Sequence, residues 1–307
     1  MTLPLLEAIQ QRVLLGDGAM GTQLQMAGLE PGGSGEGWNV AHPDRILAIQ
    51  KRYVDAGSDV LLTNTFGGCR IMLERHDHAN DTVAINRDAV HIARQAFDGR
   101  PGYVIGDIGP FGGLLEPLGD IPEKAVRAAF AEQAKALVDA GADAIIIETQ
   151  TSLEELGIGI QAAREAGAPC VIASMAFDVT FDKSAARTMM GIDPAQAAEF
   201  MAKAGVDIAA LNCGTGIDVL WAAKITKQYR QACDLPVMAQ PNAGQPVLEK
   251  MKVHYKQTPD EMSADLPELF EAGPRIIGGC CGSTPEHIAM IRQHIDQHNN
   301  EHNNERS

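Results

Sequence analysis

Short apolar runs recur along the chain, and most of them are apolar throughout rather than alternating with polar residues. Four of these runs follow the same sequence pattern, in which a helix-like segment ends at Ala-Gly. The pattern and the apolar run after it occupy residues 55–64, 139–149, 203–213 and 271–281. Glycine in that place can adopt the left-handed conformation that ends a helix. The repeated pattern therefore predicts a helix, a tight loop and then a buried strand.

Four further apolar runs, at residues 13–17, 103–107, 170–175 and 236–240, bring the expected strands to eight. Continuous apolar runs are typical of parallel strands that are covered on both faces. Segments with apolar residues three and four positions apart, such as 123–141, separate the strands as expected for helices. This α/β order predicts a (β/α)8 barrel in a single domain. An open, doubly wound sheet is the alternative, because sequence alone does not reveal closure.

The expected barrel occupies residues 1–295, and residues 296–307 form a polar tail. The tail is low in complexity and has no apolar face, which predicts disorder. His294, His298 and His302 have the spacing of four that can capture a metal ion, but a solvated terminal face is the preferred interpretation.

Composition removes several classes of function. The net charge of -15 would repel a phosphate backbone, so nucleic acid is not an expected partner. No apolar stretch approaches the ~20 residues needed to cross a bilayer. Six scattered cysteines, together with an N-terminus that lacks a basic segment followed by an apolar run, predict a cytoplasmic protein with reduced thiols.

Residues with useful chemistry follow almost every expected strand. In a (β/α)8 barrel the site is built where strands end and the following loops begin. The residues at those places are Asp17, Asn64, Asp107, Glu148, Cys213, Asn242, Cys280 and Cys281. Three of the six cysteines therefore lie on one face, after the sixth and eighth strands.

Cys213, Cys280 and Cys281 predict a zinc site, because three thiolates can converge on one soft metal and tetrahedral sulfur coordination suits zinc. Adjacent residues of a regular strand point to opposite sides. The glycines that flank the Cys280-Cys281 pair allow the backbone to bend so that both sulfurs face one point. Two alternatives remain for the pair, namely one buried and one exposed thiol without a joint role, or a vicinal disulfide. Cys170 and Cys233 are expected to be structural, and Cys69, on the functional face, is expected to be a loop thiol without a partner.

Three protein ligands leave the fourth tetrahedral position open, which is typical of a catalytic zinc. Zinc at +2 with three thiolates carries a net charge of -1, which is poorly suited to making hydroxide. Such a centre is suited to bind a substrate thiol and hold it as a thiolate at neutral pH. The chemistry inferred from the residues is alkyl transfer to a thiol.

Asp17 and Glu148 are the expected contacts for the ammonium group of an amino-acid thiol, because they follow strands on opposite sides of the barrel mouth. Backbone N–H groups at Ala19 and Met20, in the turn after Asp17, could receive its carboxylate. The alternative for Asp17 is a helix N-cap.

Asn64, Asp107 and Asn242 complete the expected substrate-binding set. For Asn64 and Asp107, a role in ordering the loops is an equal alternative.

Eight segments together resemble the zinc-dependent homocysteine S-methyltransferases, and most closely the homocysteine-binding domain of cobalamin-dependent methionine synthase. They are LLGDGAMGT, WNVAHPD, GSDVLLTNTF, GDIGP, IIIET, LNCGTG, PNAG and GGCCGSTPEHI, and the likeness runs from about residue 12 to residue 295. The resemblance implies that the family's zinc ligands fall on Cys213, Cys280 and Cys281. It also implies ammonium contacts at Asp17 and Glu148 and carboxylate contacts near Ala19 and Met20, with homocysteine converted to methionine.

The methyl donor is the part that the resemblance leaves open. We expect either a separate methylcorrinoid protein, which would bring cobalamin, or a small activated donor such as S-methylmethionine. Betaine is the least favoured donor, because only 5% of the residues are aromatic and a quaternary ammonium favours an aromatic cage. The alternatives are a corrinoid-linked methyltransferase acting on another methylated substrate or thiol acceptor, and a non-catalytic protein that binds zinc or thiols.

Overall fold

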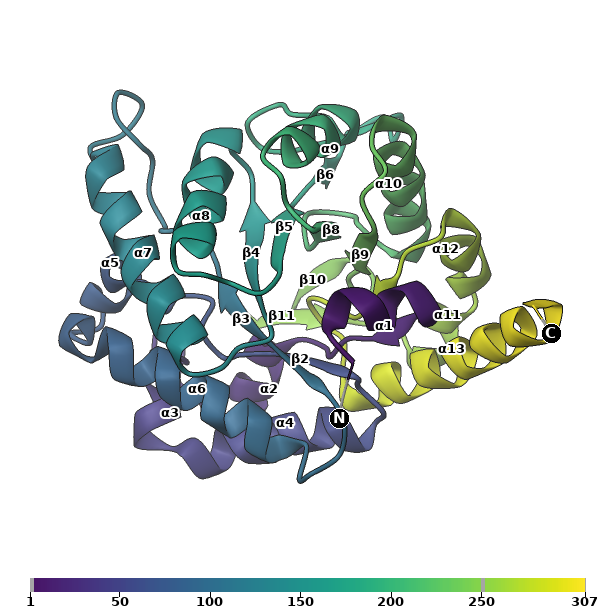
Figure 1. Cartoon of the computed structure of the whole chain (residues 1–307), viewed down its shortest axis with the longest axis horizontal. Helices are drawn as coiled ribbons and strands as arrows, with labels where there is room; N and C mark the ends of the chain where they lie inside the picture. Colours follow the sequence, from purple (N-terminus) through teal and green to yellow (C-terminus); the bar gives the residue numbers. More distant parts are fainter. Residues whose placement is uncertain (1–2, 250–251, 307) are drawn as a thin grey trace.

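Eight parallel strands form a barrel at the centre of the molecule in the computed structural model, which describes residues 3–249 and 252–306 (Figure 1). Every strand coincides with one of the apolar runs, so the predicted strands are confirmed. The barrel strands are β1 (Leu14–Leu15), β2 (Val60–Leu62), β3 (Tyr103–Ile108), β4 (Ala144–Gln150), β5 (Val171–Met175), β8 (Ile208–Asn212), β9 (Val237–Gln240) and β12 (Ile276–Ile277).

The strands follow one another in the order β1-β12-β9-β8-β5-β4-β3-β2, and every pair along this order is parallel. The seam between β1 and β2 is joined by single hydrogen bonds instead of a ladder. Asp59 N donates to Leu15 O at 2.8 Å, and Leu62 N donates to Asp17 Oδ2 at 2.9 Å. The sheet is therefore a nearly closed (β/α)8 barrel, as predicted, and not an open doubly wound sheet.

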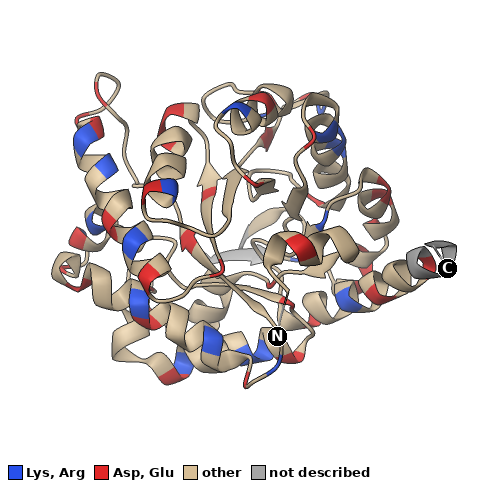
Figure 2. Cartoon of the chain, in the orientation of Figure 1, with Lys and Arg blue, Asp and Glu red and all other residues tan. Residues whose placement is uncertain are grey.

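Helices surround the strands, with α8, α9 and α10 along one side and α3, α4 and α6 along the opposite side (Figure 1). Many Lys and Arg residues lie on the helices that surround the strands (Figure 2). The helices are α1 (Leu5–Gln11), α2 (Met20–Met26), α3 (Trp38–Ala41), α4 (Pro43–Asp55), α5 (Arg70–Glu74), the short 3-10 helix η1 (Ala79–Asp81), α6 (Thr82–Ala96), α7 (Glu123–Asp139), α8 (Leu153–Glu165), α9 (Pro194–Lys203), α10 (Val219–Ala232), α11 (Pro259–Ser263), α12 (Leu266–Ala272) and α13 (Pro285–Arg306).

Apolar side chains of the barrel strands point both inward and outward, which explains their continuous apolar sequence. Inward residues such as Ile105, Ile146 and Ile172 pack with Leu5 and Ile9 of α1, which covers the amino-terminal end of the barrel. Outward residues of the same strands pack against the helices in a second, larger core. With this end filled, the opposite end of the barrel is the one that holds the polar strand-end residues.

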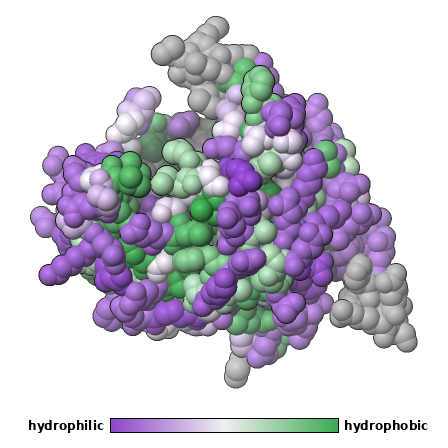
Figure 3. Space-filling view, turned by 90° about the horizontal axis from the view of Figure 1, so that it is seen from above, coloured by the Kyte–Doolittle hydropathy of each residue, from purple (hydrophilic) through white to green (hydrophobic). Residues whose placement is uncertain are grey.

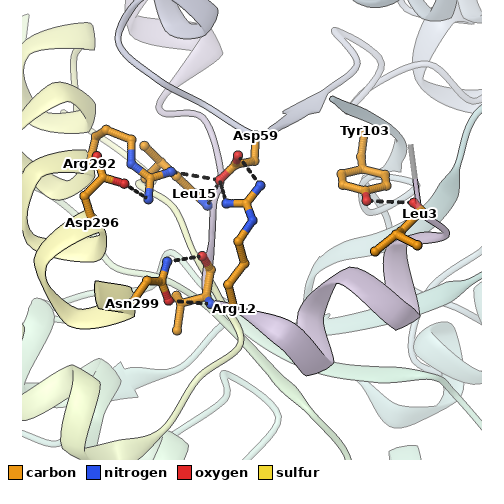
Figure 4. Close-up of polar contacts among 9 residues, drawn as sticks. Leu3, Arg12, Leu15, Asp59, Tyr103, Arg292, Asp296 and Asn299 are labelled. Atoms are coloured by element: carbon orange, nitrogen blue, oxygen red, sulfur yellow. Dashed lines mark hydrogen bonds and ion pairs between the residues drawn. The ribbon is translucent and has the colours of Figure 1, made fainter. Parts of the chain in front are cut away.

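Asp59 organises the amino-terminal end of the seam, as Figure 4 shows. Its Oδ2 atom accepts hydrogen bonds from Leu15 N at 2.8 Å and from Arg292 Nη1 at 2.9 Å. Its Oδ1 atom accepts one from Arg12 Nη2 at 2.8 Å. Asp59 thereby connects β1, β2 and α13.

The tail expected at 296–307 is different in the structure, where α13 continues as a helix through residue 306. The Asn299 side chain accepts a hydrogen bond from Val13 N at 3.0 Å and donates one to Val13 O at 3.1 Å. The His298 ring stacks on Phe270, with 4.5 Å between ring centroids. These contacts order the helix beyond residue 295, and a search for apolar periodicity could not find them.

Two hairpins were not anticipated from the sequence, β6 (Asp178–Val179) with β7 (Ala186–Arg187), and β10 (Pro246–Glu249) with β11 (Lys252–Tyr255). They follow β5 and β9 and therefore stand at the carboxyl end of the barrel. Hydrophilic side chains make up much of the exterior seen in Figure 3. Within the described residues, no helix is both long and apolar enough to span a bilayer.

Candidate metal centre

Three cysteine sulfurs converge at the carboxyl end of the barrel. Cys213 directly follows β8, and Cys280 and Cys281 follow β12. All three Sγ atoms lie within 4.8 Å of one another, and the Cys213 and Cys281 sulfurs are 3.6 Å apart. Sulfurs bound at ~2.3 Å to one tetrahedral zinc would be about 3.8 Å apart, so the cluster has the dimensions of a zinc site.

Local backbone geometry explains how neighbouring cysteines can face one point. Gly282 has φ of +81°, and a Cβ there would overlap Tyr255. Cys213 itself is left-handed, with φ of +57°, and is followed by Gly214, where a Cβ would overlap the Phe177 carbonyl. A non-glycine residue held in this region is uncommon and costs about 1–3 kcal/mol, which the surrounding contacts must offset.

The three thiols of the cluster differ in pKa. Hydrogen bonds from Cys213 and Cys280 lower the pKa of Cys281 to about 3. Hydrogen bonds to the other two sulfurs, followed by burial, hold the pKa of Cys280 well above its usual range. Cys213 keeps a raised pKa of about 12, because its contact with Cys281 and its burial outweigh a lowering contact with Cys280. Cys281 is therefore the thiol of the cluster that ionises most readily.

Three buried carboxyl groups lie on the same face of the barrel. Burial raises the pKa of Asp17 to about 7 and that of Glu148 to about 8. Burial, followed by the charge of Glu148, holds the pKa of Asp107 well above its usual range. No ion pair found among the described residues neutralises any of the three. A bound cation would stabilise their ionised forms, so the group is suited to receive an ammonium ion.

Asp17 and Glu148 are tied to the metal side of the face. Asp17 O accepts a hydrogen bond from Gly279 N at 2.8 Å, next to Cys280. The charge of Cys281 contributes to the raised pKa of Glu148, after burial and Asp17. Because the Asp17 carboxylate bonds Leu62 N and the N-cap of α2 is Ala19, the N-cap alternative for Asp17 is wrong.

The remaining predicted contacts differ in their availability. Asn64 Nδ2 donates to Gly35 O at 2.8 Å and to Asn39 Oδ1 at 3.0 Å, which favours the loop-ordering alternative. Asn242 Nδ2 donates to Gly214 O at 2.8 Å, but its buried Oδ1 has no hydrogen-bond partner. The buried Asp107 Oδ1 likewise has no geometric hydrogen-bond partner, although its carboxyl group interacts with that of Glu148. Asn242 and Asp107 therefore retain acceptor atoms for a ligand.

The backbone N–H groups of Ala19 and Met20, the two predicted contacts for a substrate carboxylate, differ in the structure. Ala19 N donates to Ser283 Oγ at 3.1 Å, so this N–H group is already engaged. Met20 begins α2 at the edge of the same face. Of the two positions, Met20 stays the predicted contact for a substrate carboxylate.

Two residues next to the sulfurs were missed in the sequence. Tyr255 on β11 interacts with Cys281, and this interaction helps lower the pKa of that thiol. Asn212 Nδ2 lies 3.8 Å from Cys280 Sγ. Asn212 had a signal, because it immediately precedes Cys213, whereas Tyr255 lies on a hairpin that no apolar pattern predicts.

The other three cysteines lie apart from the cluster. Cys170 is buried inside the barrel, where burial raises its pKa to about 12, and Cys69 is buried with a pKa raised by burial to about 11. Cys233 is half-buried at the end of α10. Among the described residues, Cys213, Cys280 and Cys281 form the cluster whose side chains are close enough together to hold a metal ion. His294 and His298 are not part of such a cluster. The side chain of His302 lies outside the described residues.

Known proteins resemble this chain in sequence. The sequence profile of the family described as Homocysteine S-methyltransferase matches residues 14–295. Methionine synthase from Mycobacterium leprae is 35% identical over 301 residues, which are 92% of this chain and 24% of that protein. Methionine synthase from Mycobacterium tuberculosis is also 35% identical, over 92% of this chain and 25% of that protein.

The fold has solved counterparts. The metallated form of the homocysteine methyltransferase MmuM from Escherichia coli superposes with a TM-score of 0.76, at 22% identity, over 93% of this chain and 97% of that one. A pyruvate carboxylase from Rhizobium etli reaches a TM-score of 0.55 at 17% identity, over 94% of this chain and 27% of that one. The barrel alone is therefore shared between different chemistries.

The protein is a (β/α)8 barrel with a three-cysteine centre at the carboxyl end of its strands. The chain belongs to the homocysteine S-methyltransferase family, which confirms the resemblance seen in the sequence. It spans about a quarter of the length of the methionine synthases that it matches.

Proposed function

We propose that the protein transfers a methyl group to the sulfur of L-homocysteine and forms methionine, with a zinc ion held by Cys213, Cys280 and Cys281. The observation that carries this proposal is the three-sulfur cluster beside three buried carboxyl groups on one face of the barrel. A thiol-binding centre next to an ammonium-binding pocket matches the two ends of an amino-acid thiol.

Zinc suits this donor set, because three thiolates at these separations fit tetrahedral coordination and leave one position for a ligand. Bound zinc would lower the pKa of the substrate thiol and present it as a thiolate. Cys281 has the lowest pKa of the three thiols. Binding of zinc by three thiolates would release the protons that the sulfurs still carry.

The chain's own residues orient the amino acid. Glu148 and Asp17 would bind the ammonium group, and its charge would return their pKa values toward the ordinary range of a carboxyl group. Asp107 supports Glu148 through the interaction of their buried carboxyl groups and is not required to contact the substrate itself. The Met20 N–H group would bind the substrate carboxylate. Asn242 Oδ1, which is unpaired and buried, completes the polar lining.

The donor is proposed to be a methylcorrinoid group on a separate protein or domain, with S-methylmethionine as the small-molecule alternative. Exposed apolar residues on loops at the carboxyl end of the barrel support a docked donor. Leu114, Leu118 and Met190 line a cavity of about 140 Å³ between the loops after β3 and β5. Exposed apolar clusters of this kind are typical of protein-binding surfaces. We also propose a cytoplasmic location, which the six free cysteines support.

The test is donor-specific turnover by the zinc-loaded protein. L-homocysteine is supplied with a methylcobalamin-carrying protein, with S-methylmethionine or with betaine, and methionine is measured by mass spectrometry. Methionine from either of the first two donors supports the proposal and identifies the donor. Methyl transfer only to a different thiol would overturn the acceptor assignment, and absence of product with every donor would favour a thiol-binding protein without catalysis.

A further inference from the structure

The side chain of Asn212 connects the sulfur cluster to the amino-acid pocket. Asn212 is the last residue of β8 and is 1% exposed. Its Nδ2 atom donates to Thr149 Oγ1 at 2.7 Å and lies 3.8 Å from Cys280 Sγ. Its Oδ1 atom accepts from Ser174 Oγ at 2.6 Å and from Thr149 N at 3.1 Å. One amide therefore contacts β4, β5 and the loop after β12.

The orientation of this amide follows from its partners. Thr149 N can only donate, so the atom that faces it must be the carbonyl oxygen of Asn212. The NH₂ group must then face Thr149 Oγ1 and the Cys280 sulfur. Both N–H groups and both acceptor positions of the amide are engaged. A buried amide that is fully satisfied in one orientation is rigid, because any rotation would leave polar atoms without partners.

On the pocket side, Asn212 holds an unusual backbone conformation. Thr149 has φ of +56°, which is uncommon for a β-branched residue, and it lies within an irregularity of the β4–β5 pairing between Ile147 and Gln150. Asn212 bonds both the N–H and the hydroxyl group of Thr149. These bonds stabilise the bulge, and the bulge sets the direction of Glu148, the preceding residue.

On the metal side, the same amide faces a sulfur that is proposed to bind zinc. A hydrogen bond to a ligand sulfur withdraws electron density and fixes the ligand's orientation. In a centre with three thiolates, less donation from Cys280 leaves the metal better able to hold a fourth, substrate sulfur. We propose that Asn212 is a positioning residue that sets both the Cys280 ligand and the direction of Glu148, and thereby the span between the sulfur and ammonium sites. This inference rests on the proposed zinc centre.

The test uses the Co²⁺-substituted protein, whose sulfur-to-metal charge-transfer absorption reports the ligand sulfurs without turnover. In Asn212→Ala we expect this absorption to shift to lower energy, together with a roughly 10- to 100-fold loss of metal affinity. We also expect weaker homocysteine binding. Ser174→Ala is the matched control, because it removes one hydrogen bond to Asn212 and leaves the contact with Cys280 intact. It should leave the spectrum unchanged.

A second variant separates the contact of Asn212 with Cys280 from its contacts with Thr149. It also provides a test if Asn212→Ala does not fold. Thr149→Gly tolerates the positive φ but removes the hydroxyl acceptor. We expect it to keep the wild-type Co²⁺ spectrum while weakening homocysteine binding severalfold. A wild-type spectrum and homocysteine affinity in Asn212→Ala would overturn the inference, and so would wild-type homocysteine affinity in Thr149→Gly. Absence of the charge-transfer band in the wild-type protein would instead overturn the three-cysteine centre itself.

Discussion

The buried carboxyl groups of Glu148 and Asp107, on the neighbouring strands β4 and β3, interact with each other. Two buried carboxyl groups in contact cannot both ionise at low cost, so the pair retains a proton near neutral pH. A substrate ammonium group can replace that proton as the positive partner. This exchange makes the carboxyl pair a recognition element for an amino acid.

Glu148→Gln tests that element. The amide has the same shape but cannot form a charged contact with the ammonium group, so we expect homocysteine affinity to fall by about 1.5–3 kcal/mol, or roughly 10- to 150-fold. Zinc content should stay at one ion per chain. Calorimetry and elemental analysis of the same sample measure the two quantities, and wild-type affinity in the variant would remove Glu148 from the ammonium site.

The metal ligands are tested by Cys280→Ala and Cys281→Ala. Either change leaves two thiolates, so we expect both zinc retention after dialysis and methionine formation to be lost together. Cys233→Ser is the matched control, since this thiol lies at the end of α10 and is half-buried like the three cluster thiols. It should retain the metal. A Cys280→Ala protein that stays zinc-loaded and active would contradict the three-cysteine centre.

The stability of the metal-free protein should depend on pH through Glu148. Its pKa is about 8 when folded, against an ordinary value of 4.5. The folded state therefore binds the extra proton, and the stability that this provides is present at low pH and is lost as the pH rises toward 8. Cys281 acts in the opposite direction, because its pKa falls on folding.

Comparison of the wild type with Glu148→Gln tests the contribution of the Glu148–Asp107 carboxyl pair, since Cys281 is common to both proteins. We expect the wild type to lose stability relative to Glu148→Gln between about pH 5 and pH 8. Thermal unfolding of both proteins, measured across this range, provides the check. Parallel pH profiles would show that Glu148 has an ordinary pKa in the folded protein.

Asp59 should matter for stability and not for binding. Asp59→Ala leaves Leu15 N and Arg292 without their acceptor at the barrel seam, so we expect a loss of about 1–3 kcal/mol in the free energy of unfolding. Asp296→Ala removes only an exposed partner of Arg292 and should cost less than about 0.5 kcal/mol. Denaturant unfolding measures both. Equal losses in the two variants would contradict the role assigned to Asp59.

Much of the fold could be predicted from sequence because parallel barrel strands are buried on both faces. The resulting apolar runs, such as that of β5, are visible without any contact information. The convergence of Cys213 with Cys280 and Cys281 followed from strand-end positions in a closed barrel. The helical contacts of Asn299 with Val13 could not be predicted, because they join residues 286 positions apart through polar groups.

The sequence also could not predict which side-chain atoms are left free to bind a ligand. Asn64 and Asn242 both follow a barrel strand. The Asn64 side chain donates hydrogen bonds to Gly35 and Asn39, whereas Asn242 has a buried oxygen without a partner. Whether such an amide has hydrogen-bond partners depends on how the loops pack in the folded protein. The same holds for Tyr255, which reaches Cys281 from a hairpin after β9.

The most direct test of the account is calorimetric titration of the zinc-loaded protein with L-homocysteine, in buffers of different ionisation enthalpy and beside a zinc-stripped control. The thiol should lose its proton to the buffer on binding, and the carboxyl pair should release a further proton to the buffer when the ammonium group takes its place as the positive partner. We therefore predict zinc-dependent binding with release of more than one proton in the wild type near neutral pH, and smaller release in Glu148→Gln. Binding of equal strength without zinc, or zinc-dependent binding without proton release, would contradict thiolate capture at the three-cysteine centre.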